Sequence, residues 1–231
     1  MNSDRVSMRW LSLGALGLVA VMAAVTMIVV TGGRLPAEAC SNDALFAGEA
    51  KIGGPFELVD GSGRTVTERE VFVEPSLLYF GFANCPGICP VDNARNAAAI
   101  SLLELQGLSA QPVFVSVDPE RDTPEALAEY GLMFHDRMIT LTGSTEQVRF
   151  AAAAYRVAYS KRPMPNSDDY AIDHSTYTYL VLPGEGVVEF FRRNETPERI
   201  AEAVMCFSRS RGYAQLPIGA RQPSRHGSLN A

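Results

Sequence analysis

The sequence predicts one α/β domain over residues 51–207, preceded by a single transmembrane helix. Short apolar runs alternate with helical patterns along the domain, which is typical of a sheet with helices packed on it. No internal repeat and no second set of core-forming segments is present in the sequence. With 47% hydrophobic and 20% charged residues, the composition excludes a disordered chain and suffices for one core of good size.

The first half of the domain is expected to contain a hairpin, a buried strand and a helix. Residues 56–66 place a Gly-Ser-Gly turn between two strand-like runs, which predicts an N-terminal β-hairpin. Residues 76–82 are almost wholly apolar, as in a central strand covered on both faces. Apolar residues then recur at helical spacing over 91–105. A strand is therefore expected to lead into a helix through the turn between them.

The second half continues the alternation and ends in a hairpin and a final helix through Phe207. Ser and Thr residues at capping positions mark three further helix starts. The polar segment 161–173 is expected to be a loop that ends at His174. The expected order of elements is ββαβαβαββα. The remaining strands and helix caps are expected at 112–117, Thr123, 138–142, Ser144, 176–182, 187–191 and Thr196.

Charge is distributed unevenly along the chain. The formal net charge of −6 separates into +2 on residues 1–34, −12 on residues 35–207 and +4 on residues 208–231. An acidic domain lacks the clustered Lys and Arg side chains that hold a phosphate backbone, which excludes a general nucleic-acid binder. The Ser-, Gly-, Pro- and Arg-rich segment 208–231 is expected to be a disordered basic tail.

The apolar run 11–31 is uncharged and has the length of a helix that crosses a bilayer. Because Arg5 and Arg9 precede it, residues 1–10 are expected to be cytoplasmic. Residues 32–50 are then a linker. The domain is expected in the periplasm or an equivalent exported space, attached to the inner (cytoplasmic) membrane by this single pass. In such an oxidising compartment cysteines are paired, bound to metal or actively kept reduced.

Two alternatives to an uncleaved anchor involve processing. Residues 37–39 (AEA) offer a small-x-small cleavage site, but the apolar run is longer than the roughly 7–15 residues of a signal peptide. Cys40 suggests a lipoprotein, although the residues before it lack the pattern that lipid attachment needs. A buried core helix is unfavourable because no polar face interrupts the run. The anchor is the favoured interpretation.

Two cysteines separated by three residues are the strongest chemical feature. Cys85 and Cys89 lie between the predicted strand 76–82 and the helix that follows. The free N–H groups and the dipole of a helix start lower thiol pKa values, and the resulting thiolates are nucleophiles and metal ligands. The alternative is a short structural disulfide, which gains little because it closes a very small loop.

His174 is expected to approach these thiols although it is distant in sequence. If strand 176–182 runs antiparallel to 76–82, the segment that enters it lies at the sheet end where the cysteine turn begins. Asp173 or a backbone carbonyl is expected to fix the tautomer of the imidazole. A histidine beside an aspartate is more often a surface residue, so this inference depends on the cysteine turn.

The three side chains together form a soft donor set. Two thiolates and one imidazole suit Cu(I), or Cu(II) with an added ligand. Structural zinc normally takes four protein ligands, and the sequence offers no convincing fourth. Copper is therefore the expected metal of Cys85, Cys89 and His174.

Three segments of the sequence match motifs of a known family. They are residues 81–90 (GFANCPGICP), 115–125 (VSVDPERDTPE) and 173–175 (DHS). With them the chain resembles the SCO/SenC family of membrane-anchored, thioredoxin-like copper chaperones. The resemblance covers about residues 50–207. Asn84 departs from the His or Lys that many relatives carry at its position.

The resemblance implies a thioredoxin-like fold in which Cys85, Cys89 and His174 bind copper. It further implies a chaperone that delivers this copper to the dicopper centre of cytochrome c oxidase during assembly. The expected partners are the copper-bearing oxidase subunit, other copper chaperones, a thiol reductase and, through the N-terminal helix, the membrane. No catalytic residue is expected in such a chaperone.

Other functions would use the same residues. In a thiol–disulfide oxidoreductase Cys85 and Cys89 would be catalytic. Thioredoxin-type reductases carry a cis-proline facing their cysteines, whereas this chain has residues 173–175 there, which favours copper. A peroxidase is disfavoured because Phe82, not Thr, stands three positions ahead of Cys85. A copper or redox sensor is compatible with all of these observations.

The remaining cysteines, Cys40 and Cys206, lie outside the three motifs. Cys206 lies on the flank of the last helix, and Cys40 precedes the domain. In an oxidising compartment the alternatives are a disulfide that ties the linker to this helix, and two free or separately buried thiols. The expected core residues of the helix are Ile200, Ala203, Val204 and Phe207.

Overall fold

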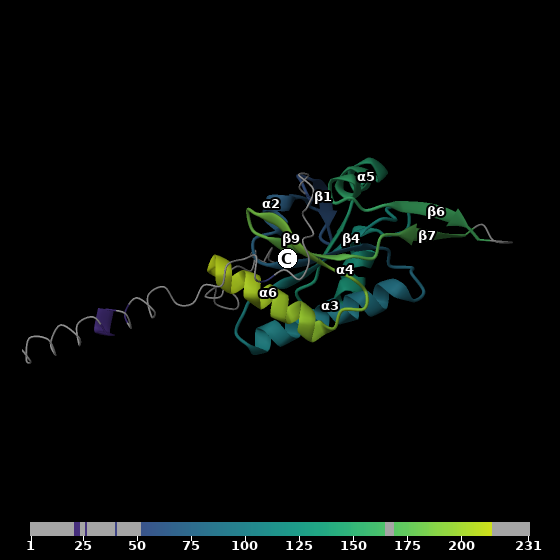
Figure 1. The fold of residues 1–231 in the computed structure, drawn as a ribbon. Coiled ribbons are helices and arrows are strands. Elements are labelled where there is room, and N and C mark those ends of the chain that lie inside the picture. The colour runs from purple at the N-terminus through teal and green to yellow at the C-terminus, as the bar shows by residue number, and fades with distance from the viewer. Residues whose placement is uncertain (1–20, 24–25, 27–39, 41–51, 165–168, 214–231) are drawn as a thin grey trace, which may run out of the picture. The chain divides into compact units, whose positions relative to one another are not determined.

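A computed structural model describes residues 21–23, 26, 40, 52–164 and 169–213 (Figure 1). Most of the predicted span 11–31, all of 1–10, the linker 32–50 apart from Cys40, and residues 214–231 lie outside the described residues. Residues 1–36 form a separate unit, in which the four described positions are helical. Within the described ranges no helix is long and apolar enough to cross a membrane.

A seven-stranded mixed sheet forms the centre of the domain, with strand order β2-β1-β5-β4-β3-β8-β9. The strands β3, β4 and β5 are parallel, whereas β1 and β8 pair antiparallel to their neighbours β5 and β3. The predicted N-terminal hairpin is present and extends the sheet at one edge. The strands are β1 (Glu57–Asp60), β2 (Thr65–Thr67), β3 (Ser76–Gly81), β4 (Gln111–Ser116), β5 (Ile139–Thr142), β8 (Thr178–Leu182) and β9 (Gly186–Phe191).

Helices begin where the capping residues predicted them. Thr123 and Thr196 each accept a hydrogen bond from a backbone N–H in the first turn, and Ser144 forms a capping box with Gln147. One short helix, α2, was not predicted. The helices are α2 (Glu68–Val71), α3 (Ile88–Leu105), α4 (Pro124–Leu132), α5 (Thr145–Ala154) and α6 (Pro197–Arg211).

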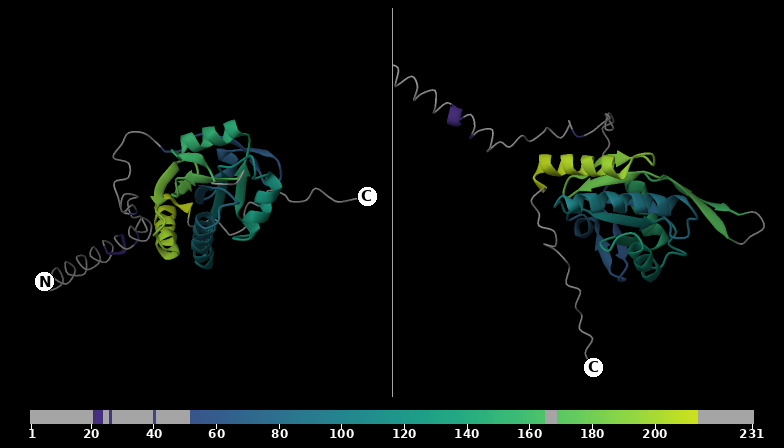
Figure 2. Two further views of the ribbon diagram at one scale, coloured as in Figure 1. Left: turned by 90° about the vertical axis from the view of Figure 1, so that its right-hand side faces the viewer. Right: turned by 90° about the horizontal axis from the view of Figure 1, so that it is seen from below.

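Two hydrophobic clusters lie on the two faces of the sheet. On one face α3 and α6 lie side by side, and Ile100 and Val204 pack there with Leu180 of the sheet (Figure 2). The other cluster joins Leu127 of α4 and Val148 of α5 to the opposite side of the strands. Three layers of this kind are what the alternating pattern of strands and helices predicts.

The prediction that residues 161–173 form a loop is wrong, because most of this segment belongs to a second, two-stranded sheet. Its strands β6 (Tyr159–Pro163) and β7 (Tyr170–His174) pair antiparallel and form a ribbon that projects beyond the main sheet (Figure 1). Four of the five residues of β6 are exposed, so the alternation that identifies a half-buried strand is absent. His174 is therefore the last residue of a strand rather than of a loop.

The helix α3 is where the spacing predicted it, but most apolar residues of that spacing lie outside. Val91 and Leu105 are 62% and 85% exposed. The face toward the sheet carries Ile100 together with the buried polar residues Asp92 and Asn96. The helix thus turns polar groups inward, toward the cysteine turn at its start.

The last helix runs further than predicted. It continues past Phe207 to Arg211, so the segment 208–231 that was expected to be a disordered tail begins as helix. Gly212 follows with φ of 82°, a left-handed conformation that glycine adopts without steric cost and that commonly ends a helix. The expected core residues Ile200 and Val204 are fully buried.

A disulfide joins Cys40 to Cys206 across a sequence separation of 166. Cys40 is buried and packs with the cluster on the α6 side of the sheet. Of the two alternatives for these cysteines, the structure contains the bridge, which fixes the chain before the domain to the last helix.

Removing this bridge is expected to lower the free energy of unfolding by about 2–4 kcal/mol, because the bond restricts a long stretch of the unfolded chain. Cys40→Ser and Cys206→Ser should lower the urea midpoint, followed by far-UV circular dichroism, by equal amounts. The double variant should lower it no further, since each change removes the same bond. Additive shifts would contradict this account.

Candidate metal centre

The cysteine turn begins where a fully buried strand, β3, ends. All residues of β3 are buried, and its last residue, Gly81, is followed by a turn in which the Cys85 N–H donates to the Phe82 carbonyl at 3.3 Å. The helix α3 starts at Ile88, with Gly87 as its N-cap. Cys85 thus lies in the predicted turn between strand and helix, whereas Cys89, also predicted in that turn, lies in the first turn of the helix.

The structure brings the two thiols and His174 together. The Sγ atoms of Cys85 and Cys89 and a ring nitrogen of His174 all lie within 4.8 Å of one another. The Cys89 Sγ is 3.4 Å from His174 Nε2, and the Cys89 N–H donates to the Cys85 Sγ at 3.4 Å. This approach depends on the antiparallel pairing of β8 with β3, which places the segment before Thr178 beside the end of β3.

A backbone carbonyl fixes the imidazole tautomer. His174 Nδ1 lies 2.9 Å from the Ser175 carbonyl oxygen, which only accepts hydrogen bonds, so Nδ1 carries the proton. The lone pair of Nε2 therefore faces the Cys89 thiol. Asp173, the other expected partner, points elsewhere and pairs with Arg162 at 3.2 Å.

The two thiols differ in their acidity. Burial, the largest effect, raises the pKa of Cys85, but hydrogen bonds from the backbone N–H groups of Gly87, Ile88 and Cys89 outweigh it and leave this pKa below its usual value. For Cys89 burial dominates, and the hydrogen bond with Cys85 also raises its pKa. Burial lowers the pKa of His174 and favours the neutral imidazole, which is the form that binds metals.

Two aromatic rings hold the imidazole in place. The rings of Tyr79 and Phe82 both meet His174 edge to face, with centroid distances of 6.1 and 5.9 Å. The Tyr79 hydroxyl donates to Asp92 Oδ2 at 3.0 Å, and both residues are buried. The sequence gives no signal for this pair, because a tyrosine in an apolar strand is indistinguishable from an ordinary core residue.

The buried carboxylate of Asp92 is compensated by two arginines. Arg193 approaches it at 3.3 Å and Arg95 at 3.7 Å. The Arg95 side chain is itself buried and donates to Thr178 Oγ1 at 2.8 Å, which connects the helix to β8. A buried charge is tolerated only when paired and hydrogen-bonded, so this network explains why α3 carries charged residues inward.

The second sequence motif holds the cysteine turn in position. Asp122 accepts hydrogen bonds from the Ala83 N–H at 3.0 Å and from the Ser116 hydroxyl at 2.5 Å. The carboxylate therefore ties the loop after β4 to the residues immediately before Cys85. Burial is the main cause of a raised pKa at Asp122, and these two hydrogen bonds oppose it.

The same motif holds the hairpin that carries His174. Arg121 pairs with Asp118, donates to Asp169 Oδ1 at 2.5 Å, and lies 3.9 Å from the centroid of the Tyr170 ring. The Tyr170 hydroxyl donates to Asp118 at 2.7 Å. One loop thus fixes both the cysteine turn and the start of β7. The sequence motif identified the turn residues, but it gave no indication that they contact Tyr170.

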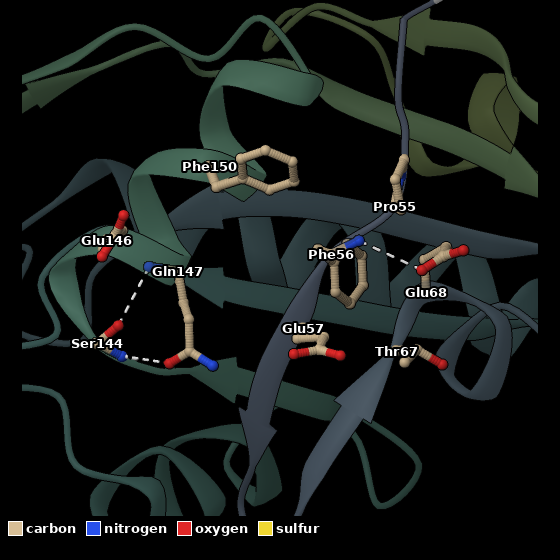
Figure 3. A pocket seen from close by; sticks show the side chains of 9 residues that line it. All are labelled: Pro55, Phe56, Glu57, Thr67, Glu68, Ser144, Glu146, Gln147 and Phe150. Atoms are coloured by element: carbon tan, nitrogen blue, oxygen red, sulfur yellow. Dashed lines mark hydrogen bonds between the residues drawn. The ribbon is translucent and has the colours of Figure 1, made fainter.

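A cavity of about 430 Å³ lies elsewhere, between α5 and the N-terminal hairpin (Figure 3). Phe56 and Phe150 supply apolar walls, and Glu57, Glu68 and Glu146 supply carboxylates. Its lining contains no Cys, His or Met, so this cavity offers no soft metal ligand.

A thiol pair at a strand-to-helix turn, faced by an imidazole from the segment that leads into the antiparallel neighbour β8, defines a thioredoxin-like protein with a candidate soft-metal centre. The family model described as SCO1/SenC matches residues 46–208, and the chain belongs to this family. Among its relatives, the protein SenC of Rhodobacter capsulatus is 44% identical over 190 residues, which are 82% of this chain and 84% of SenC.

Solved structures agree with this assignment and show the thioredoxin-like fold. The crystal structure of Arabidopsis thaliana ScoI with copper bound has a TM-score of 0.65 and 41% identity, covering 71% of this chain and all of that one (100%). Yeast Sco1 with copper bound has a TM-score of 0.63 and 35% identity, covering 68% of this chain and 87% of that one.

Gly81→Ala is expected to destabilise the protein by about 1–3 kcal/mol, because no space exists for a side chain. A Cβ atom there would lie 2.9 Å from the Tyr79 ring and 3.0 Å from both Cys89 Sγ and the Phe114 ring. Gly87→Ala is the matched control, since nothing lies within 4 Å of its Cβ. Urea unfolding measures both. Equal stability of the two variants would contradict the close packing.

At pH 7 Cys85 is expected to react with iodoacetamide at least about tenfold faster than Cys89, since a lowered pKa increases the thiolate fraction and a raised one reduces it. As the pH is raised, the alkylation rate of Cys85 should reach its plateau at a lower pH than the rate of an unperturbed thiol. At the pH of that plateau, the alkylation rate of Cys89 should still be rising. Peptide mass spectrometry measures both sites. In urea the rates should become equal, and equality in the folded protein would refute the assignment.

Proposed function

We propose that this protein is a metallochaperone that binds copper through Cys85, Cys89 and His174. The observation that carries the proposal is the convergence of two sulfurs and one imidazole nitrogen within 4.8 Å. Copper would replace the thiol protons and accept the lone pair of Nε2, which the Ser175 carbonyl already leaves free. Relatives at 41% and 35% identity whose solved structures contain copper support the same choice of metal.

The proposed donor set also suits release of the metal. Two thiolates and a neutral imidazole satisfy Cu(I) with three ligands and leave room for one more. An incoming ligand from an acceptor protein can therefore bind before a ligand of the chaperone leaves, so that copper passes through a shared intermediate. Cys85, less buried than Cys89, is the sulfur that an acceptor would reach first.

The acceptor that we propose is the copper-bearing subunit of cytochrome c oxidase, whose dicopper centre would receive the metal during assembly. Membership of the SCO1/SenC family supports this choice. Other copper chaperones would load the site, and a thiol reductase would keep Cys85 and Cys89 reduced.

We further propose that residues 11–31 anchor the chain in the inner (cytoplasmic) membrane, with residues 1–10 in the cytoplasm. The domain would then face the periplasm or an equivalent exported space. The 21-residue uncharged run and the preceding Arg5 and Arg9 support this topology. A disulfide between Cys40 and Cys206 is consistent with an oxidising compartment.

His174→Ala is expected to weaken Cu(I) binding by at least about tenfold, because the site loses its nitrogen ligand. Competition of the reduced protein with a chromogenic Cu(I) chelator measures this affinity. His135→Ala is the matched control: its ring lies 3.5 Å from Glu104, outside the proposed ligand set, and its removal should leave the affinity unchanged. Equal affinities of the wild type and His174→Ala would refute the three-ligand site.

A second candidate, a thiol–disulfide oxidoreductase, is favoured by the opposite pKa shifts of the two cysteines. A low-pKa, partly accessible Cys85 would attack a target disulfide, and buried Cys89 would then resolve the mixed disulfide. Reduction of insulin by the same preparation separates the two functions. Strong reduction that is independent of copper would favour the oxidoreductase over the chaperone, and a copper or redox sensor would show neither activity.

A further inference from the structure

The outward side of α3 carries no charged side chain. Of its three charged residues, Asp92 and Arg95 are buried and Glu104 pairs with Arg137 at 2.9 Å. Ser101 is the only polar residue exposed between Ile88 and Leu105. An exposed helix face without charges is unusual in a soluble domain and marks a candidate interaction surface. Its exposed apolar residues are Ile88, Val91, Ala94, Ala98 and Leu105.

The C-terminal ends of α3 and α6 lie at the same end of the domain. The strands that precede them, β3 and β9, run in the same direction because both pair antiparallel with β8. Each helix follows its strand after a short connection, and the two helices lie side by side (Figure 2). Leu105 therefore shares this end with the exposed residues Arg209 and Arg211.

Two exposed arginines lie at this end, close to Glu185 and to Glu104, which pairs with Arg137. Arg209 and Arg211 are exposed in the last turns of α6, and Arg211 also approaches Glu185 at 3.2 Å. Glu202 is exposed on the same helix but lies two turns before the end. The sequence that follows, 214–231, adds two arginines and no acid.

The disulfide places the entry of the chain on this same side. Cys206 lies on the flank of α6, partly buried against the cluster on the α6 side of the sheet. Residue 40 is bonded there, and only residues 32–39 separate it from the end of the apolar run 11–31. At about 3.3–3.6 Å per residue, this length holds Cys206 within roughly 30 Å of the proposed anchor.

We propose that this α3–α6 outer surface, formed by Ala98 and Leu105 of α3 and by Arg209 and Arg211 of α6, rests on the anionic lipid surface of the membrane that holds the chain. The inference rests on the proposed anchor and is independent of copper. Leu105 enters the interfacial region, and the two arginines make weak attractions to the lipid phosphates. Because a tether supplies a high effective concentration, a contact this weak is sufficient.

Fluorescence quenching by brominated lipids tests the proposal with the full chain in vesicles of phosphatidylcholine and phosphatidylglycerol. Trp10 is the only tryptophan, so Trp10→Phe gives a silent background. In that background Leu105→Trp is expected to lose at least about half of its emission. Phe150→Trp is the matched control: this residue is 59% exposed on α5, against the opposite face of the sheet, and should be quenched little.

A charge reversal controls for the membrane affinity of the introduced tryptophan. Arg209→Glu with Arg211→Glu should reduce the quenching of Leu105→Trp at least about twofold, since repulsion replaces attraction. Arg64→Glu with Arg69→Glu, exposed residues at the N-terminal hairpin and α2, should leave it unchanged. Quenching that is insensitive to the first pair would overturn the lipid contact.

Vesicle flotation separates the possible failures. If the chain floats but the tryptophans at positions 105 and 150 are quenched equally, or neither is quenched, the proposed lipid contact is wrong. The exposed apolar face of α3 would then be a candidate binding surface for a protein partner. A chain that does not float would overturn the anchor and this inference together. Copper binding, measured on the same samples, tests the proposed metal site separately, because neither the anchor nor the lipid contact involves the metal ligands.

Discussion

The antiparallel pairing of β8 with β3 is the constraint on which the whole site depends. It opposes Tyr79 to Thr178, and thereby brings a segment from the far end of the chain beside the turn that carries both cysteines. Without this register, His174 and Cys89 would have no reason to meet. The pairing is reinforced from the helix side, because Arg95 of α3 donates to the Thr178 hydroxyl. The geometry of the centre is thus set by strand register and then secured by side chains.

The sequence predicted the elements that local chemistry determines. Capping residues such as Thr123 and Ser144 marked helix starts, apolar runs marked the central strands, and the cysteine spacing with the family motifs marked the site residues. It failed where tertiary contacts decide the outcome. The ribbon β6–β7 has little apolar periodicity, and it is held by the contacts that Arg121 makes with Tyr170 and Asp169. No local signal could reveal partners that are about fifty residues apart.

The helix α3 shows how a functional site can override the usual pattern of a core. Its buried face contains Asp92, which binds the Tyr79 hydroxyl, and Asn93, whose amide donates to the Tyr130 hydroxyl at 3.0 Å. Such buried polar networks contribute less to stability than apolar packing would, but they fix a unique arrangement of the groups around the thiols. The spacing of apolar residues therefore identified the helix correctly, while its inner face combines apolar residues such as Ile100 and Leu103 with buried polar groups, and its outer face exposes apolar residues.

The disulfide between Cys40 and Cys206 also sets how far the candidate metal centre can travel. With the bond intact, the chain between the proposed anchor and its first fixed point ends at residue 40; with the bond reduced, it extends to Ile52, the first residue of the continuous fold. The upper limit on reach then grows from roughly 30 Å to roughly 70 Å. The volume available to the domain increases about tenfold, and its local concentration beside a membrane-bound acceptor falls accordingly. A bond far from the thiols would in this way control how often they meet their target.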